Sequence, residues 1–127
     1  MRTSVMVALT LLMAVVLAGT LTEGHMERLA SRYISAAEEL QALTQQENWQ
    51  RAGEVVESYI RDWRDRVPAL QTLINHEDAD EVTLALMTLQ AAIEAQDKAG
   101  CLMACAELRE HAEHLHHRDA LNWGNVL

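Results

Sequence analysis

The sequence predicts an all-α protein, in which an N-terminal transmembrane or signal helix precedes an antiparallel four-helix bundle of two helical hairpins. The composition is rich in Ala, Leu, Glu and Gln, with one Pro and no Phe, which favours helix. A charge-free apolar run lies near the N-terminus. After it, apolar residues recur at steps of three and four, the period of amphipathic helices. We therefore divide the chain into an N-terminal segment, residues 1–22, and a helical domain, residues 25–127.

The N-terminal apolar run extends from Val5 to Leu21 and contains only two Thr and one Gly among its apolar residues. At the helical rise its length is about 25 Å, the short end of what crosses a bilayer core. Two interpretations stay open: a retained membrane anchor, or a signal peptide cleaved after Ala18. Lipid attachment is excluded, because Gly19 is followed by Thr20 and not by Cys.

Charge predicts the location and excludes one class of partner. Arg2 precedes the apolar run, so we expect the N-terminus inside and the acidic remainder outside the cytoplasm. The formal charge is −9, and removing the +1 of Arg2 leaves −10. Such a chain repels nucleic-acid phosphates and anionic head groups, and it has no basic stripe to offset this repulsion. The expected partners are the cytoplasmic membrane, through residues 5–21, and a protein or a second copy, but no nucleic acid.

The first predicted hairpin joins a helix from Met26 to about Gln46 to a second helix that Asn48 caps. Trp63 is predicted to be a core residue of the second helix, and Pro68 is expected to end or kink that helix. The apolar stripes of the two helices are Met26, Leu29, Tyr33, Ala36, Leu40 and Leu43, then Trp49, Ala52, Val56, Tyr59, Trp63 and Val67.

The second predicted hairpin follows a short turn, residues 70–74. Asp78 and Glu81 have capping-box spacing for its first helix, and Asp97 is placed to cap its last helix. The two hairpins also resemble one another at a constant offset of 49 positions, which aligns Asn48 with Asp97. Two copies are too few for a solenoid, so we expect the hairpins to pack face to face.

Cys101 and Cys105 are four residues apart on the last predicted helix and share a face with apolar residues. A disulfide between them would be strained. Two small buried thiols are favoured over a redox or metal pair.

Several dispersed segments resemble the bacterial family catalogued as domain of unknown function 4363. They are residues 73–97, 106–115 and 121–127, together with the Asn48-Trp49 turn. The resemblance implies a helical fold and an N-terminal membrane segment, and it leaves activity open. Ala79, Trp123 and Gly124 depart from the family pattern. That pattern picks out Trp49, Ala52, His76, Glu77, Leu86, Leu89, His114, Leu121, Asn122, Asn125 and Leu127.

Histidines near the end of the last helix are the most conspicuous candidate ligands. His111, His114 and His117 are spaced three and three, and His76 would join them if its loop folds back. This set of four supports an alternative function, a metal-responsive binding protein. The competing interpretation is a solvated, pH-responsive helix end. No HExxH signature is present.

Nothing in the sequence favours an enzyme. The acidic run Glu77, Asp78, Asp80 and Glu81 lacks the spacing of a calcium loop. No phosphate-binding Gly loop, activated nucleophile or cofactor motif occurs. We therefore expect no cofactor, and a non-enzymatic interaction or structural module.

The C-terminal tail is apolar, unlike most free tails. It either docks on the bundle or presents a surface to a partner. That surface would consist of Asn122, Trp123, Asn125, Val126 and Leu127.

Overall fold

Four α-helices make up the described part of the chain. They are α1 (Arg2–Gln45), α2 (Trp49–Leu70), α3 (His76–Glu94) and α4 (Lys98–Gly124). The structure is a computed structural model that describes the backbone of residues 1–124 and the side chains of residues 1–115. It contains no strand in that part, so the predicted all-α class is confirmed.

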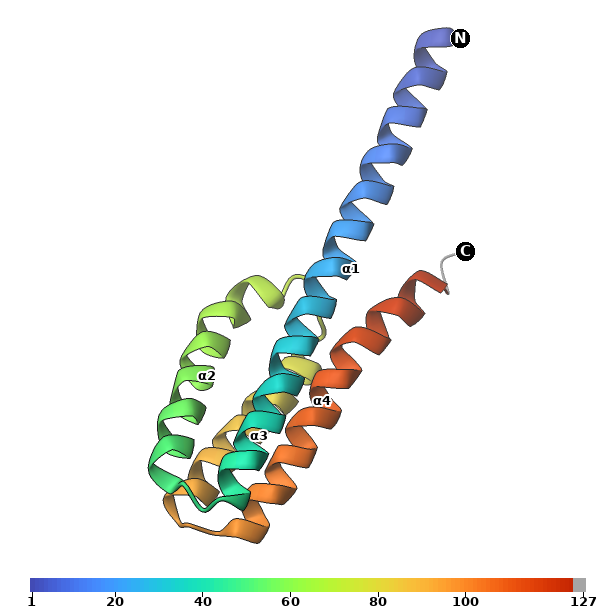
Figure 1. The fold of residues 1–127 in the computed structure, drawn as a ribbon. Coiled ribbons are helices and arrows are strands. Elements are labelled where there is room, and N and C mark those ends of the chain that lie inside the picture. The colour runs from blue at the N-terminus through green and yellow to red at the C-terminus, as the bar shows by residue number, and fades with distance from the viewer. Residues whose placement is uncertain (125–127) are drawn as a thin grey trace.

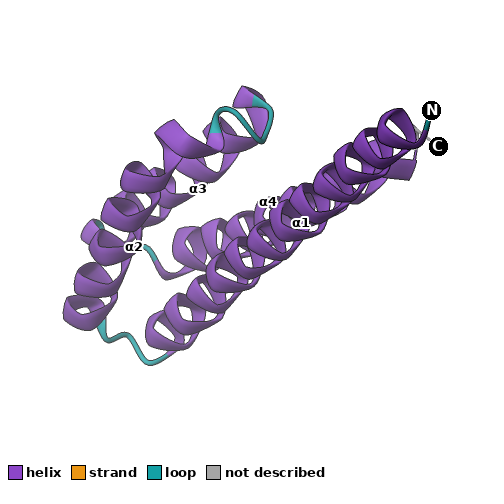
Figure 2. Ribbon diagram, turned by 90° about the horizontal axis from the view of Figure 1, so that it is seen from above, coloured by secondary structure: helices purple, strands orange, loops and turns teal. Residues whose placement is uncertain are grey.

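The helices form an antiparallel bundle of two layers (Figures 1 and 2). One layer pairs α1 with α4, and the other pairs α2 with α3. Each layer therefore takes one helix from each hairpin, as expected for hairpins that pack face to face. Of the neighbouring helix pairs, α1 and α2 have the least extensive contact. The α2–α3 turn lies at the end of the bundle from which the N-terminal part of α1 projects (Figure 1). We call this end the anchor end.

Helix α1 runs without a break from the apolar segment into the bundle (Figure 1). The sequence predicted a separate first bundle helix beginning at Met26, whereas the structure continues one helix through residues 22–25. A single glycine in that stretch, Gly24, costs about 1 kcal/mol relative to Ala, and no proline interrupts the hydrogen bonds. One helix therefore supplies both the apolar projection and one side of the core.

The core begins at Met26, which is fully buried, and extends through all four helices. The predicted stripes are confirmed at their centres, because Tyr33, Leu40, Val56 and Trp63 are buried. The stripe residues nearer the seams or ends are only partly buried; they are Leu43, Trp49, Tyr59 and Val67.

The predicted internal repeat is visible in the two hairpin turns. Glu47 and Gln96, 49 positions apart, both adopt positive φ, 55° and 52°. Asn48 accepts a hydrogen bond from the Arg51 amide, and Asp97 accepts one from the Gly100 amide. Both predicted caps are thus confirmed, and the two copies of the hairpin use the same turn geometry.

The capping box predicted for α3 is wrong. Asn75 caps the helix and accepts a hydrogen bond from the Glu77 amide at 3.4 Å, so Asp78 lies inside the first turn. Asn is as good a cap as Asp, and Asn75 is placed earlier in the chain. Glu81 instead approaches α4, with its Oε2 3.2 Å from His111 Nδ1. In α2, Pro68 lies in the last turn, and the helix ends at Leu70.

Candidate functional site

The projecting part of α1 presents apolar side chains that no other part of the described chain covers. Leu12 is 61% exposed and Val15 is 56% exposed. Among the described helices, α1 is the one that is long and apolar enough to cross a membrane. The same pattern is typical of a signal sequence near an N-terminus. Exposing this much apolar surface to water is unfavourable, so the segment either lies in a lipid bilayer or is cleaved from the protein.

Beyond the apolar segment, a polar cluster joins α1 to α2. Asp62 Oδ2 accepts hydrogen bonds from Tyr33 Oη at 2.7 Å, Arg66 Nε at 2.9 Å and Arg32 Nε at 3.0 Å. Burial alone would raise the pKa of Asp62, but the hydrogen bonds from Arg66, Tyr33 and Arg32 hold that pKa below its usual value. Because the contact between α1 and α2 is otherwise thin, this cluster fixes how the two helices meet.

Aromatic rings back this cluster on its core side. Tyr33 packs edge-on against Trp63, with ring centroids 5.0 Å apart, and against Tyr59 at 6.0 Å. The Tyr59 hydroxyl donates to Glu39 Oε2 at 3.1 Å. Burial, followed by the hydrogen bond to Asp62, raises the pKa of Tyr33, so this phenol stays protonated and serves as a donor.

Replacing Asp62 should loosen the α1–α2 seam. We expect Asp62→Ala to lower the free energy of unfolding by about 1 to 2 kcal/mol, since three donors lose their acceptor at a partly exposed site. The lowered pKa means that Asp62 stabilises the fold above its unfolded value of about 3.8, and that this contribution is lost as the pH falls through the folded value. Urea unfolding at neutral and acidic pH checks both points. A variant as stable as the wild type at neutral pH would contradict the prediction.

A basic groove opens beside the polar cluster, at the anchor end of the α1–α2 seam. It has a volume of about 310 Å³ and is lined by His25, Arg28, Leu29 and Arg32 of α1 and by Arg66 of α2. The sequence analysis missed this groove. The spacing of His25, Arg28 and Arg32 places them within about 60° on one face of a helix, a signal that was available. Arg66, however, is 34 positions beyond Arg32, and only the packing of α2 brings it there.

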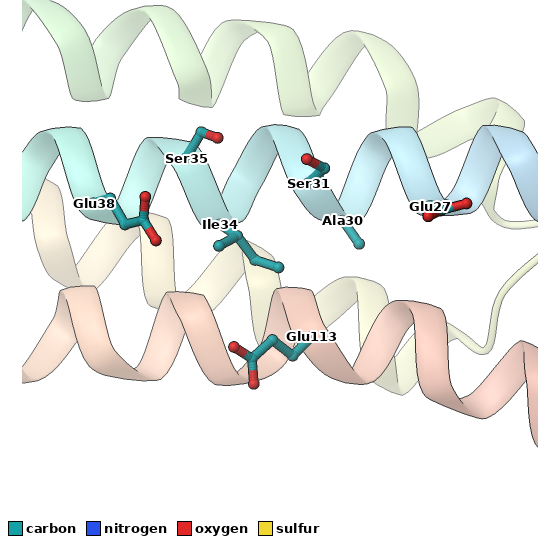
Figure 3. Close-up of a pocket in the computed structure, with 7 residues that line it drawn as sticks. All are labelled: Glu27, Ala30, Ser31, Ile34, Ser35, Glu38 and Glu113. Carbon is teal, nitrogen blue, oxygen red and sulfur yellow. The ribbon is translucent and has the colours of Figure 1, made fainter.

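An acidic groove lies on the opposite side of α1, between α1 and α4 (Figure 3). Its volume is about 470 Å³. Ile34 points toward α4, and Glu113 lies along α4 (Figure 3), where its Oε1 is 3.4 Å from Arg109 Nε of the same helix. Arg109 Nη2 lies 3.6 Å from Glu38 Oε1 and ties the two helices together. The lining consists of Glu27, Ala30, Ser31, Ile34, Ser35, Glu38 and Glu113.

The two cysteines are free and buried in α4 against the core. Burial, with a contribution from the Cys101 thiol, raises the pKa of Cys105 to about 12. Burial also raises the pKa of Cys101. Both side chains therefore stay as neutral thiols near pH 7, and the predicted small buried residues are confirmed.

The histidines proposed as metal ligands are only partly covered by the structure. Among the side chains of residues 1–115, no group of three His, Cys, Asp or Glu residues is placed to hold a metal ion. His111 faces Glu81, and its Nδ1 is buried without a well-aligned hydrogen bond. The side chain of His117 lies outside the described residues. The set of His76, His111, His114 and His117 stays a prediction from spacing.

The C-terminal surface predicted from sequence also falls largely outside the described part. The backbone of Asn122 and Trp123 belongs to α4, but their side chains are not described. Asn125, Val126 and Leu127 lie outside the described residues. Whether this tail meets a partner stays a prediction.

Comparison with known proteins supports the resemblance found in the sequence. The model of the family described as Domain of unknown function (DUF4363) matches residues 21–126. No curated protein and no solved structure matches the chain. The match covers the whole bundle and begins at the last residue of the apolar segment. The chain therefore belongs to the DUF4363 family.

Proposed function

We propose that this protein is a single-pass, membrane-anchored helical module that binds a protein partner or a second copy of itself and performs no catalysis. The unbroken helix α1 is the observation that carries the proposal. Its exposed apolar part and its buried part, which begins at Met26, belong to one rigid element. An anchor built this way holds the bundle at the membrane surface with no flexible linker.

Charge supports an orientation with the N-terminus inside and the bundle outside the cytoplasm. Arg2 precedes the apolar segment, and the remainder of the chain is acidic. Cleavage after Ala18 would instead give a secreted domain. The bundle would keep its core in either form, because the first buried core residue is Met26.

The described side chains favour a binding role over catalysis. The two thiols are buried and their pKa values are raised, which disfavours a nucleophilic role. Neither groove is an enclosed cavity, and each is bordered by several charged side chains, unlike the enclosed pockets of most enzymes. The net charge of −9 favours a basic or neutral protein partner over nucleic acid.

Extraction of membranes at alkaline pH, followed by intact-mass measurement, tests the anchor. We expect the full-length protein to stay in the membrane pellet and its bundle to be digested by protease added from outside. Release by alkali would contradict the anchor. A mass beginning at Gly19 would contradict retention, and protection from external protease would contradict the orientation.

A further inference from the structure

We infer that the basic groove binds the phosphate of an anionic phospholipid head group in the leaflet from which α1 emerges. The groove is defined by His25, Arg28, Leu29, Arg32 and Arg66, as described above. The inference rests on the membrane anchor proposed in the previous subsection. It concerns a ligand that the net charge of the chain, taken alone, would repel.

The depth of the groove matches the head-group layer. A bilayer of 40 to 45 Å with a hydrocarbon core of about 30 Å leaves roughly 5 to 8 Å of head groups on each side. The apolar segment ends at Leu21, and Gly24 is about 5 Å farther along the helix axis. Arg28 Nη1 lies 3.9 Å from the position that a Cβ on Gly24 would take. The guanidinium of Arg28 is therefore at head-group level.

The direction of the side chains follows from the polarity of α1. Side chains on an α-helix tilt toward its N-terminus, which in α1 is the membrane side. Arg28 consequently extends toward the bilayer, whereas the Arg32 guanidinium lies across the seam, beside Asp62 and 5.6 Å from the centroid of the Tyr59 ring. Gly24 contributes no side chain, so the space beside the Arg28 guanidinium stays open.

The local charge is positive although the chain is acidic. Arg32 and Arg66 share the single carboxylate of Asp62, at 3.0 and 2.9 Å. Arg28 forms no ion pair with any side chain of residues 1–115. Three arginines and one aspartate leave a net charge of +2 before His25 is counted. Glu27, the nearest acidic neighbour in sequence, lines the acidic groove on the α4 side.

The chemistry of these groups suits a phosphodiester. A guanidinium presents parallel N–H donors that match two phosphate oxygens, and it stays charged at any physiological pH. A volume of about 310 Å³ accommodates a phosphate together with a small alcohol head group. Phosphatidylglycerol is therefore a suitable probe, and phosphatidylcholine, whose head group is zwitterionic, is its control.

Native mass spectrometry of the full-length protein in nonionic detergent tests the inference. We expect the wild type to bind phosphatidylglycerol more tightly than phosphatidylcholine with the same acyl chains. Arg28→Gln should weaken phosphatidylglycerol binding about fivefold and phosphatidylcholine binding by a smaller factor, because the choline cation offsets the charge of the same phosphodiester. Arg61→Gln is the matched control, because this substitution removes the same charge from α2 at a residue that does not line the groove. This control should bind like the wild type.

Three results would overturn the inference. The first is equal binding of the two lipids by the wild type, and the second is an equal loss of phosphatidylglycerol binding in Arg28→Gln and Arg61→Gln. The third is a rise in the melting temperature of the lipid-free wild type with millimolar inorganic phosphate that equals the rise with phosphatidylglycerol. The last result would assign the groove to soluble phosphates. Flotation of the same variants with phosphatidylcholine vesicles separates failure of the head-group inference from failure of the membrane anchor. If the anchor is correct, both variants should still float.

Discussion

Trp63→Ala should lower the free energy of unfolding by about 3 to 5 kcal/mol, the cost of a large cavity in a packed core. Trp63 is 1% exposed and is the largest fully buried side chain among residues 1–115. Its ring meets Tyr33 edge-on, and its Nε1 donates to Thr83 Oγ1 at 2.8 Å. The Thr83 hydroxyl also donates to the Ala79 carbonyl, so the cavity and not an orphaned hydroxyl dominates the loss. Domains of this size are stabilised by about 5 to 15 kcal/mol, so the variant would be marginal.

Urea unfolding of the full chain in nonionic detergent, followed by circular dichroism, measures this loss. Trp49→Ala is the matched control, because Trp49 is only partly buried at the far end of the bundle. It should cost less than half as much. A loss of under about 1 kcal/mol for Trp63→Ala would contradict the assignment of this residue to the core.

Leu12→Arg should lower the ratio of membrane-bound to free protein by two orders of magnitude or more. An arginine near the centre of a membrane helix costs about 2.5 to 3.5 kcal/mol, and the lost leucine adds a few tenths. Each 1.4 kcal/mol changes a partition ratio tenfold. Leu12 lies near the middle of the apolar segment and makes no contribution to the buried core, so the bundle itself should stay folded.

Flotation with vesicles, with circular dichroism of the unbound fraction, measures the effect. Leu84→Arg is the matched control, because Leu84 is 68% exposed on α3, outside the anchor. It should float like the wild type. A Leu12→Arg variant that still floats fully would show that residues 5–21 do not anchor the protein.

Local features of the fold could be predicted because they depend on a few neighbouring residues. Asn48 and Asp97 cap their helices through side-chain oxygens three residues before the donating amides. The offset of 49 positions predicted equivalent turns, which the shared positive φ of Glu47 and Gln96 confirms. The capping box at Asp78 failed because two residues competed for one role, and pattern alone does not rank Asn75 against Asp78.

The continuity of the helix between the anchor and the bundle could not be predicted from the sequence pattern, for a different reason. Residues 22–25 are polar, which resembles a boundary, but they contain nothing that breaks a helix. Packing of Met26 and Leu29 holds the next turn in helical geometry, and the helix continues across. Polarity changes along a chain mark a change of environment and do not require a change of backbone conformation.

The sequence by itself determined that this chain is helical, where its hairpins turn, and which segment is apolar enough for a membrane. Those properties follow from periodicity, caps and length, which are local. Only the tertiary structure decided how charge is distributed at the anchor end. The net charge does not say where the charged residues lie, so the value of −9 gave no indication of a local excess of arginine. Packing of α2 against α1 brings Arg66 to Arg28 and Arg32, while Glu27 faces the other groove. The physical reason is that helix packing places residues far apart in sequence side by side.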